Sequence, residues 1–367
     1  MGCGPYKGDS MSLLDKIKKN STIKDTAILS ESKFFNKKDM IPTPIPALNI
    51  ALSGRLDGGL TPGLTMWAGP SKHFKTAFSL MMARSYLDKY PEAVMLFYDS
   101  EFGTPQSYFE SFGIDMTRVI HTPITDVEQL KFDAMQQLNS LERGERLIVV
   151  IDSIGNLASK KEVEDALDGK SVGDMSRAKQ LKSFFRMVTP HLTLKDIPMV
   201  VVNHTYKTLE LYSKDVVGGG TGSYYSADNI FILGRQQEKD GKETVGYNFI
   251  INVEKSRYVK EKSKIPIEVT YEGGISKWSG LLDIAMTTGH VIKPSNGWYS
   301  RVDMETGEIE DKKHRYDATQ SKDFWMPILT SKTFQAAVEK LYTVSHGAII
   351  KEEDDVSEVL AAIEGDE

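Results

Sequence analysis

One short stretch of the chain constrains the fold more than any other: an apolar run, a loop that opens with glycine, and a Lys-Thr pair that leads into a helical pattern. The run is Leu64–Ala68 and the pair is Lys75-Thr76. A loop that closes onto a helix N-terminus points several backbone N–H groups at one spot, where the helix dipole also favours anions. The lysine adds a positive charge for outer phosphates, and the threonine hydroxyl can hold Mg²⁺. We therefore predict a nucleotide-binding loop formed by Gly69, Pro70, Ser71, Lys72, His73, Phe74, Lys75 and Thr76.

One position of this loop departs from the usual pattern G-x-x-x-x-G-K-[ST]. Phe74 stands directly before the lysine, where the pattern has glycine and where a side chain risks crowding the phosphates. The alternative interpretation is a turn that happens to carry Lys-Thr, but the loop residues by themselves favour the nucleotide site.

Apolar runs alternate with helical patterns along much of the chain, which predicts βαβ units and a mainly parallel, doubly wound sheet. Beyond about residue 228 the pattern changes to strands joined by an Asp240-Gly241 hairpin turn, which predicts antiparallel additions to one edge. The predicted parallel strands are Leu64–Ala68, Val94–Tyr98, Arg118–Thr122, Leu147–Ile151 and Met199–Asn203, the helices between them include Ala77–Tyr90, Asp126–Arg143 and Ser176–Thr189, and the antiparallel strands are Asn229–Arg235, Gly246–Glu254 and Ile265–Tyr271.

The organisation outside this core follows from local patterns. Ser12–Asn20 predicts a short amphipathic helix whose apolar face has no partner in its own segment, and Leu281–Thr288 and Lys332–Tyr342 predict helices of a small C-terminal piece. We predict an N-terminal element with a linker over 1–40, the α/β core over 41–280, a small C-terminal domain over 281–345 and an acidic tail over 346–367.

Composition argues against a disulfide-stabilised protein and against a membrane-spanning one. The 367 residues include a single cysteine, Cys3, which suits a reducing cytosol, and no apolar run reaches the roughly 18 residues of a membrane span. The net charge is −6, but eight acidic residues lie in Glu352–Glu367, so the rest of the chain is slightly basic. Such a tail either competes for a basic groove or serves solubility. We expect a cytoplasmic protein with no membrane partner.

Polar residues follow three of the predicted strands, at the sheet edge where an open α/β sheet binds its ligands. Glu101 is suited to polarise an attacking water, Asp152 to hold magnesium, and Asn203 with His204 to contact a γ-phosphate. The alternative for each residue is helix capping or solvation of the sheet edge. Because several such strand ends converge, we favour a hydrolytic nucleotide site.

Two segments, 159–173 and 205–217, have the composition of mobile loops. In the second, tyrosines alternate with lysines, an arrangement that can stack on bases and neutralise phosphates without reading sequence. A surface loop without function has the same composition. The triple glycine that follows, Gly218-Gly219-Gly220, favours a segment that rearranges.

The densest basic stretch of the chain is Lys255–Lys264. As a solvated strand edge it would only prevent aggregation between sheets. Alternatively, its lysines reach across a subunit interface to a neighbour's phosphates, as an arginine finger does.

Together these segments resemble the RecA-type recombinases, and among them the UvsX-type recombinases of T-even-type phages. The resemblance extends from about Met11 to Tyr299 and is loose in the tail. The strings that carry it are S-K-F-F-N at 32–36, G-P-S-K-H-F-K-T at 69–76, F-Y-D-S-E-F-G at 97–103, I-D-S-I-G-N-L-A-S-K-K at 151–161, N-H-T-Y at 203–206 and G-G-G-T-G at 218–222.

The resemblance implies an ATP- and Mg²⁺-dependent protein that forms filaments on single-stranded DNA and carries out pairing and strand exchange with double-stranded DNA. It further implies a mediator protein and a single-stranded-DNA-binding protein as partners, and a polymerisation role for the N-terminal helix. His204 stands where bacterial RecA has a γ-phosphate-sensing glutamine, so we expect sensing to depend on protonation of the imidazole. The implied catalytic residues are Glu101, Lys75, His204 and the trans-acting Lys260 and Lys262, Tyr108 would pack on adenine, and the implied DNA-binding residues are Lys160, Lys161, Lys170, Tyr206, Lys207, Tyr212, Lys214, Gly218, Gly219 and Gly220.

Two other functions are compatible with the same motifs. A hexameric DNA helicase has the same core but forms closed rings. A non-hydrolysing DNA-binding accessory protein is the second alternative, if Phe74 disables the loop. The intact Lys75-Thr76 pair and Glu101 argue against it.

Overall fold

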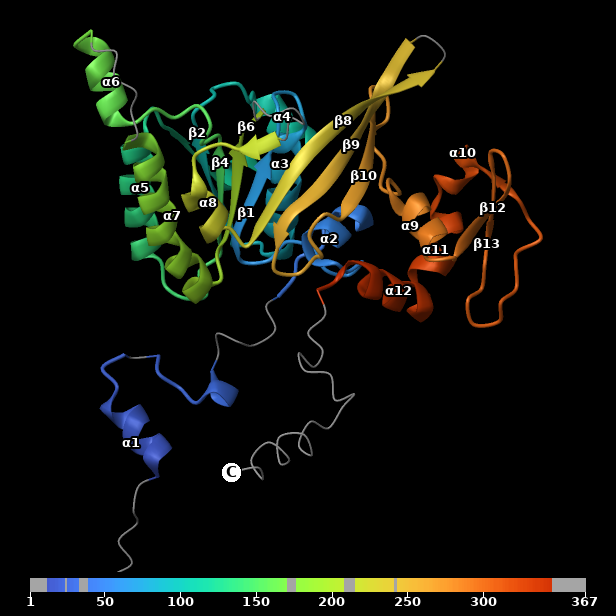
Figure 1. Cartoon of the computed structure of the whole chain (residues 1–367), viewed down its shortest axis with the longest axis horizontal. Coiled ribbons are helices and arrows are strands. Elements are labelled where there is room, and N and C mark those ends of the chain that lie inside the picture. The colour runs from blue at the N-terminus through green and yellow to red at the C-terminus, as the bar shows by residue number, and fades with distance from the viewer. Residues whose placement is uncertain are drawn as a thin grey trace, which may run out of the picture. The chain divides into compact units, whose positions relative to one another are not determined.

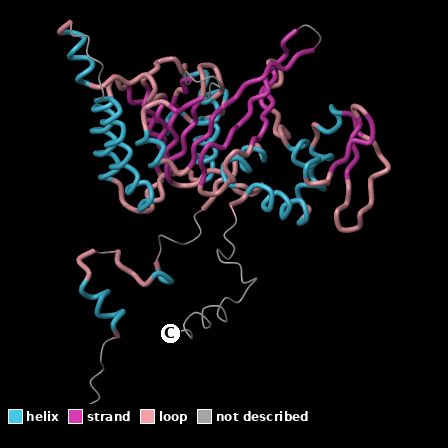
Figure 2. The backbone as a smooth tube through the Cα atoms, in the orientation of Figure 1, coloured by secondary structure: helices cyan, strands magenta, loops and turns pink. Residues whose placement is uncertain are grey.

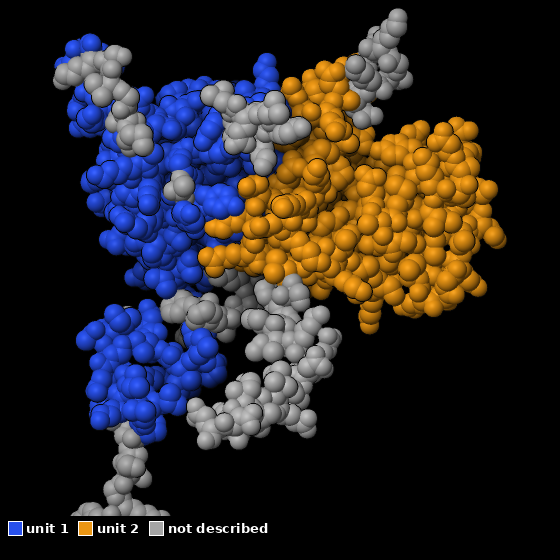
Figure 3. All heavy atoms as spheres, viewed as in Figure 1, with its two compact units in different colours: residues 1–41, 60–232 blue, residues 42–59, 233–367 orange. Residues whose placement is uncertain are grey.

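The computed structural model describes residues 12–23, 25–32, 39–169, 176–207, 215–240 and 243–344. The chain divides into two compact units, which Figure 3 colours separately. The first contains residues 1–41 and 60–232, and the second contains residues 42–59 and 233–367. The predicted boundaries near residues 40, 280 and 345 remain a proposal about domain organisation.

A parallel sheet forms the centre of the first unit. Three of its strands are buried at every position, as expected of a sheet covered on both faces. All neighbouring strands in the order β3-β2-β4-β5-β1-β8 are parallel. The strands are β1 (Gly63–Ala68), β2 (Val94–Asp99), β3 (Val119–Pro123), β4 (Leu147–Asp152), β5 (Pro198–Asn203) and β8 (Asn229–Asp240), the last of which continues into the second unit.

Helices cover both faces of this sheet because side chains alternate between the faces along each strand. On one face Met66 belongs to the same apolar cluster as Leu130 of α5 (Val127–Ser140) and Phe184 of α7 (Ser176–Lys195). Figures 1 and 2 show α5 and α7 side by side. On the other face the Trp67 ring lies 5.1 Å from Phe78 of α3 (Lys75–Lys89). The other elements of this unit are α1 (Leu13–Asn20), η1 (Leu29–Glu31), α4 (Gln106–Ser111), η2 (Met116–Arg118), α6 (Lys160–Leu167), β6 (Thr205–Lys207), β7 (Asp215–Val217) and α8 (Thr221–Ser226).

The prediction of a loop over 159–173 was wrong for its first half, which forms helix α6. Ser159 and Glu162 form a capping box, in which each side chain accepts the other residue's backbone N–H. This cap starts a helix whose charged residues suggested a loop in the sequence. The predicted loop at 205–217 contains two short antiparallel strands, β6 and β7, at its ends. Residues 170–175 and 208–214 lie outside the described residues.

The second unit carries the antiparallel strands and a separate apolar core. In β9 and β10, Ile265 pairs with Ile251 and Ile267 with Phe249. Together with the parallel strands of the first unit, these strands confirm the predicted α/β fold with a mainly parallel sheet and antiparallel edge strands. The predicted turn residue Gly241 lies outside the described residues. The unit contains α2 (Pro46–Ser53), β9 (Glu243–Ser256), β10 (Lys264–Thr270), β11 (Gly274–Ile275), α9 (Leu281–Thr287), β12 (Val291–Ser295), β13 (Trp298–Arg301), β14 (His314–Arg315), α10 (Tyr316–Thr319), α11 (Lys322–Leu329) and α12 (Lys332–Tyr342).

Candidate active site

The predicted nucleotide-binding loop joins β1 to the N-terminus of α3, as the sequence indicated. Lys75 is 6% exposed, and its ammonium donates a hydrogen bond of 2.7 Å to the Pro70 carbonyl oxygen. Burial lowers the pKa of Lys75, and the charges of Glu101 and Asp152 oppose this effect. A partly desolvated ammonium held inside such a loop is suited to bind a phosphate.

Phe74 takes a left-handed backbone conformation, with φ 62° and ψ 15°. This region costs most residues about 1–2 kcal/mol, whereas glycine enters it freely. The physical reason for glycine in the usual pattern is therefore present, although the residue is phenylalanine. The Phe74 ring packs edge-on against Phe78 of the following helix, with 6.3 Å between ring centroids.

We expect Phe74→Gly to keep nucleotide binding and to change the free energy of unfolding by less than about 1 kcal/mol. Relief of the left-handed conformation offsets the lost ring contact, worth about 0.5–1.5 kcal/mol, and the greater freedom of glycine when unfolded. Thermal unfolding and titration with a fluorescent ATP analogue measure both quantities. Phe74→Val is the matched control, because a β-branched residue fits this conformation poorly and should weaken binding. A glycine variant that loses binding would contradict the explanation.

Thr76 and Asp152 form the predicted magnesium-binding pair. The Thr76 hydroxyl donates to Asp152 Oδ2 at 2.6 Å, and Asp152 is 3% exposed. Burial raises the pKa of Asp152 to about 6; the Thr76 hydrogen bond opposes this shift, and the charges of Glu101 and Asp99 add to it.

The pair fits a divalent cation. Asp152 Oδ1 is buried and has no hydrogen-bond partner among the residues that the structure describes. Within the same residues no group of three or more His, Cys, Asp or Glu side chains could enclose a metal ion. Mg²⁺ is usually held by one or two protein oxygens together with water and substrate phosphates, which agrees with this arrangement.

The carboxylate of Glu101 accepts three hydrogen bonds at one oxygen. Ser153 Oγ lies 2.7 Å from Oε1, Asn156 Nδ2 lies 3.2 Å from it, and His204 Nε2 lies 3.1 Å from it. The His204 hydrogen bond, followed by that of Ser153, lowers the pKa of Glu101 against the effect of burial. Glu101 is therefore ionised at neutral pH, as a residue that polarises water must be.

Our reading of the sequence missed Ser153 and Asn156. Ser153 follows Asp152 directly at the end of β4 and Asn156 lies in the segment just beyond it, so the sheet edge that suggested Asp152 was a signal for them too.

His204 connects this site to the β6–β7 strands. Its backbone carbonyl oxygen accepts the Gly218 N–H at 2.9 Å, and the neighbouring Asn203 amide donates to the Gly218 carbonyl oxygen at 2.8 Å. Gly155 lies directly beside the imidazole, because a Cβ atom there would come within 2.2 Å of His204 Cδ2. The Glu101 carboxylate and the base of the second predicted DNA-binding loop are thus joined through one residue.

We expect Gly155→Ala to displace the His204 ring from Glu101 and to lower DNA-stimulated ATP hydrolysis about tenfold, the effect of one lost charge-assisted hydrogen bond. Steady-state phosphate release with and without single-stranded DNA measures the change. Gly103→Ala is the matched control, since its nearest neighbouring atom would be 3.8 Å away. Equal rates in the two variants would show that the His204 contact has no role in turnover.

The other predicted nucleotide-binding residues lie on or near the loop. His73 Nδ1 lies 2.9 Å from the Ser71 carbonyl oxygen, and Lys72 has a left-handed φ of 62°. Tyr108 lies on α4, where burial and then the charge of Asp152 raise the pKa of its hydroxyl. The role of Tyr108 at adenine stays a prediction.

The described DNA-binding candidates lie in three places: on α6, on β6 and, for Gly218, Gly219 and Gly220, between β7 and α8. Lys160 and Lys161 begin α6, and the exposed Lys161 forms an ion pair of 3.1 Å with the partly buried Asp165. On β6, Tyr206 is 58% exposed and Lys207 is exposed. Lys170, Tyr212 and Lys214 lie outside the described residues.

Lys260 and Lys262 belong to the second unit, and the Lys260 ammonium donates to the carbonyl oxygens of Lys340 and Leu341 at 2.7 and 3.1 Å. These carbonyls end α12, where the helix dipole favours a cation. Lys262 has a left-handed φ of 66°. Their action on a neighbour's nucleotide stays a prediction.

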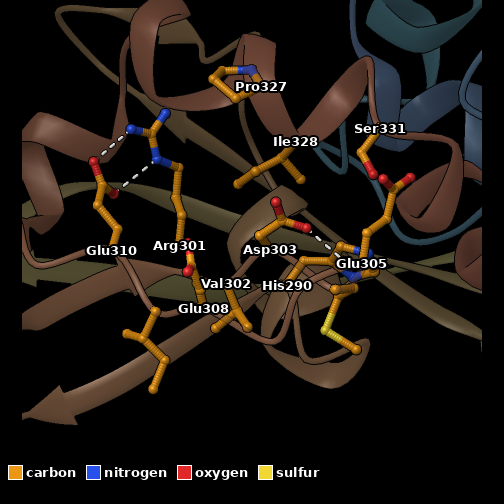
Figure 4. A pocket seen from close by; sticks show the side chains of 12 residues that line it. His290, Arg301, Val302, Asp303, Glu305, Glu308, Glu310, Pro327, Ile328 and Ser331 are labelled. Carbon is orange, nitrogen blue, oxygen red and sulfur yellow. Dashed lines mark hydrogen bonds and ion pairs between the residues drawn. The ribbon is translucent and has the colours of Figure 1, made fainter.

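A cavity of about 470 Å³ lies within the second unit, and none of residues 69–76 lines it (Figure 4). Its one arginine, Arg301, is bound by both carboxylate oxygens of Glu310. Three further acidic side chains line the cavity: Asp303, Glu305 and Glu308. This lining does not fit a nucleotide phosphate.

Comparisons with known proteins agree with the fold. The family model of the RecA N-terminal domain matches residues 11–276, and that of the C-terminal domain of the bacteriophage T4 recombination and repair protein matches residues 278–338. The recombination and repair protein of Enterobacteria phage T4 is 54% identical over 341 residues, which cover 92% of this chain and 87% of that protein. Protein RecA of Tropheryma whipplei is 26% identical over 76% of this chain and 62% of that protein, and RecA of Bifidobacterium breve is 24% identical over 80% and 76%. The chain therefore belongs to the RecA family of recombinases and carries the C-terminal domain of its UvsX-type phage branch.

Proposed function

We propose that this protein is a DNA-dependent ATPase that forms filaments on single-stranded DNA and catalyses homologous pairing and strand exchange. The observation that carries the proposal is the convergence of Lys75, the Thr76–Asp152 pair and Glu101 at one sheet edge, with Glu101 bonded to His204. Lys75, Thr76 and Asp152 suit binding a magnesium-bound triphosphate. Glu101 suits hydrolysis, and its His204 contact leads to a candidate DNA-binding loop.

In the proposed mechanism, Lys75 and the backbone N–H groups at the start of α3 bind the outer phosphates. Thr76 and Asp152 would hold Mg²⁺, which neutralises charge that develops on the phosphates. Glu101 orients the attacking water and accepts its proton. Ser153, Asn156 and His204 hold Oε1 of Glu101, so we assign the attacking water to its other carboxylate oxygen, and a change at His204 would alter both hydrolysis and the β6–β7 strands.

Binding of DNA is assigned to α6 and the β6–β7 segment. Tyr206 and Lys207 offer an aromatic ring and a cation on one exposed strand, the combination that binds single strands with little sequence preference. We expect affinity to fall steeply with salt, since phosphate contacts release counterions.

Filament formation requires a heterologous interface that does not close. Helix α1 presents Leu13, Leu14 and Ile17 at 72%, 61% and 59% exposure, an apolar stripe that suits burial against a second copy. In the assembled filament, Lys260 and Lys262 would act on the neighbour's phosphates. A mediator protein and a single-stranded-DNA-binding protein are proposed partners, and the host cytoplasm is the proposed location.

The test combines ATP hydrolysis with imaging. Phosphate release should require single-stranded DNA, and electron microscopy with ATP should show helical filaments along the DNA. Closed rings without filaments would instead favour a hexameric helicase. An absence of hydrolysis with DNA present would favour an accessory protein.

Among the described residues, no helix combines the length and apolar character needed to cross a bilayer.

A further inference from the structure

The backbone beside Glu101 is held by a buried carboxylate that the proposed mechanism does not use. Asp99, the last residue of β2, is 4% exposed. Its Oδ1 accepts the backbone N–H of Glu101 at 3.0 Å and of Phe102 at 2.8 Å. Phe102 has a left-handed φ of 54°, an unfavourable conformation that these two hydrogen bonds help to maintain.

The second oxygen of Asp99 is held by His121 on the neighbouring strand. His121 Nε2 lies 3.1 Å from Asp99 Oδ2, so this nitrogen carries the hydrogen. The imidazole is stacked on Phe97, with 5.8 Å between centroids and 25° between planes. Parallel pairing of β2 with β3, which places Phe97 opposite His121, brings the ring to this position.

We propose that His121 is a positioning residue for Glu101, acting through Asp99. A carboxylate bonded at one oxygen alone can rotate about its terminal torsion, which has a broad energy minimum. A donor at Oδ2 restricts that rotation and keeps Oδ1 in line with the two backbone N–H groups. The turn that carries Glu101 is then held in one conformation, and the catalytic carboxylate starts from a defined place. His121 touches none of the described loop residues 69–76 in any of its hydrogen bonds or ring contacts.

The inference rests on the proposed role of Glu101, and the experiment separates the two. Steady-state ATP hydrolysis on single-stranded DNA is measured for His121→Ala, His121→Gln, His121→Met and Glu101→Gln in the full-length protein. We expect His121→Ala and His121→Met to lower kcat about tenfold, with KM for ATP and DNA affinity within about twofold. His121→Gln should restore kcat to within about twofold, because its amide can donate to Asp99.

Gln106→Ala is the matched control, because Gln106 and His121 line the same cavity but the hydrogen bonds of the Asp99 carboxylate go to Glu101, Phe102 and His121. If Glu101→Gln hydrolyses ATP at the normal rate, the proposed role of Glu101 fails. If Glu101→Gln is inactive but His121→Ala and His121→Met keep normal kcat, the positioning role alone is overturned. The positioning role is also overturned if kcat is as low in His121→Gln as in His121→Ala and His121→Met. The same holds if these variants change only KM. If His121→Ala fails to fold, the comparison of kcat between His121→Met and His121→Gln tests the positioning role.

Discussion

Glu101→Gln is expected to lower ATP turnover by about 10²- to 10⁴-fold, the usual effect of removing a general base. Glutamine has nearly the same shape as glutamate and can still accept hydrogen bonds from Ser153 and His204. It cannot take a proton from water. Binding of ATP and of single-stranded DNA should therefore persist, and filaments should be trapped in the ATP-bound state. Single-turnover hydrolysis with radiolabelled ATP, together with fluorescence anisotropy on an oligonucleotide, measures the two properties.

The matched control for this prediction is Glu110→Gln, which removes the same charge from an exposed position on α4. We expect normal turnover in this variant, because Glu110 has no place in the hydrogen-bond network around Glu101. Full turnover in Glu101→Gln would refute the assignment of the catalytic carboxylate. Loss of DNA binding in the same variant would contradict the proposed separation between hydrolysis and binding.

Lys75→Met is expected to weaken ATP binding by about 10²-fold, since a hydrogen bond to a charged group is worth about 1.5–3 kcal/mol. The free energy of unfolding without nucleotide should not fall. The lowered pKa of Lys75 shows that burial penalises its charged form, and methionine has a similar length without a charge. Calorimetric titration with a slowly hydrolysed ATP analogue measures affinity, and urea unfolding measures stability.

Lys89→Met, at the far end of the same helix, is the matched control, because the Lys89 side chain is exposed. Its ATP affinity should equal that of the unmodified protein. A Lys75→Met variant that is less stable but binds ATP normally would mean that the ammonium supports the loop rather than the phosphates.

Much of the fold could be predicted because local patterns specify it. The run Leu147–Ile151 is apolar throughout and too short for a typical helix, which favours a strand buried on both faces. Where the local pattern was polar, prediction failed. Helix α6 depends on a two-residue cap, Ser159 with Glu162, and a charged surface helix differs little in composition from a loop.

The sequence by itself determined the parallel core, the nucleotide-binding loop and the acidic strand ends, because each depends on residues close together in the chain. Only the tertiary structure decided what surrounds Glu101. Its three donors come from residues at least 52 positions away, which the order of strands in the sheet brings together. Burial likewise determined the raised pKa of Asp152, and it leaves Asp152 Oδ1 without a hydrogen-bond partner among the described residues. Desolvation depends on every neighbouring atom, and a linear sequence does not state which atoms those are.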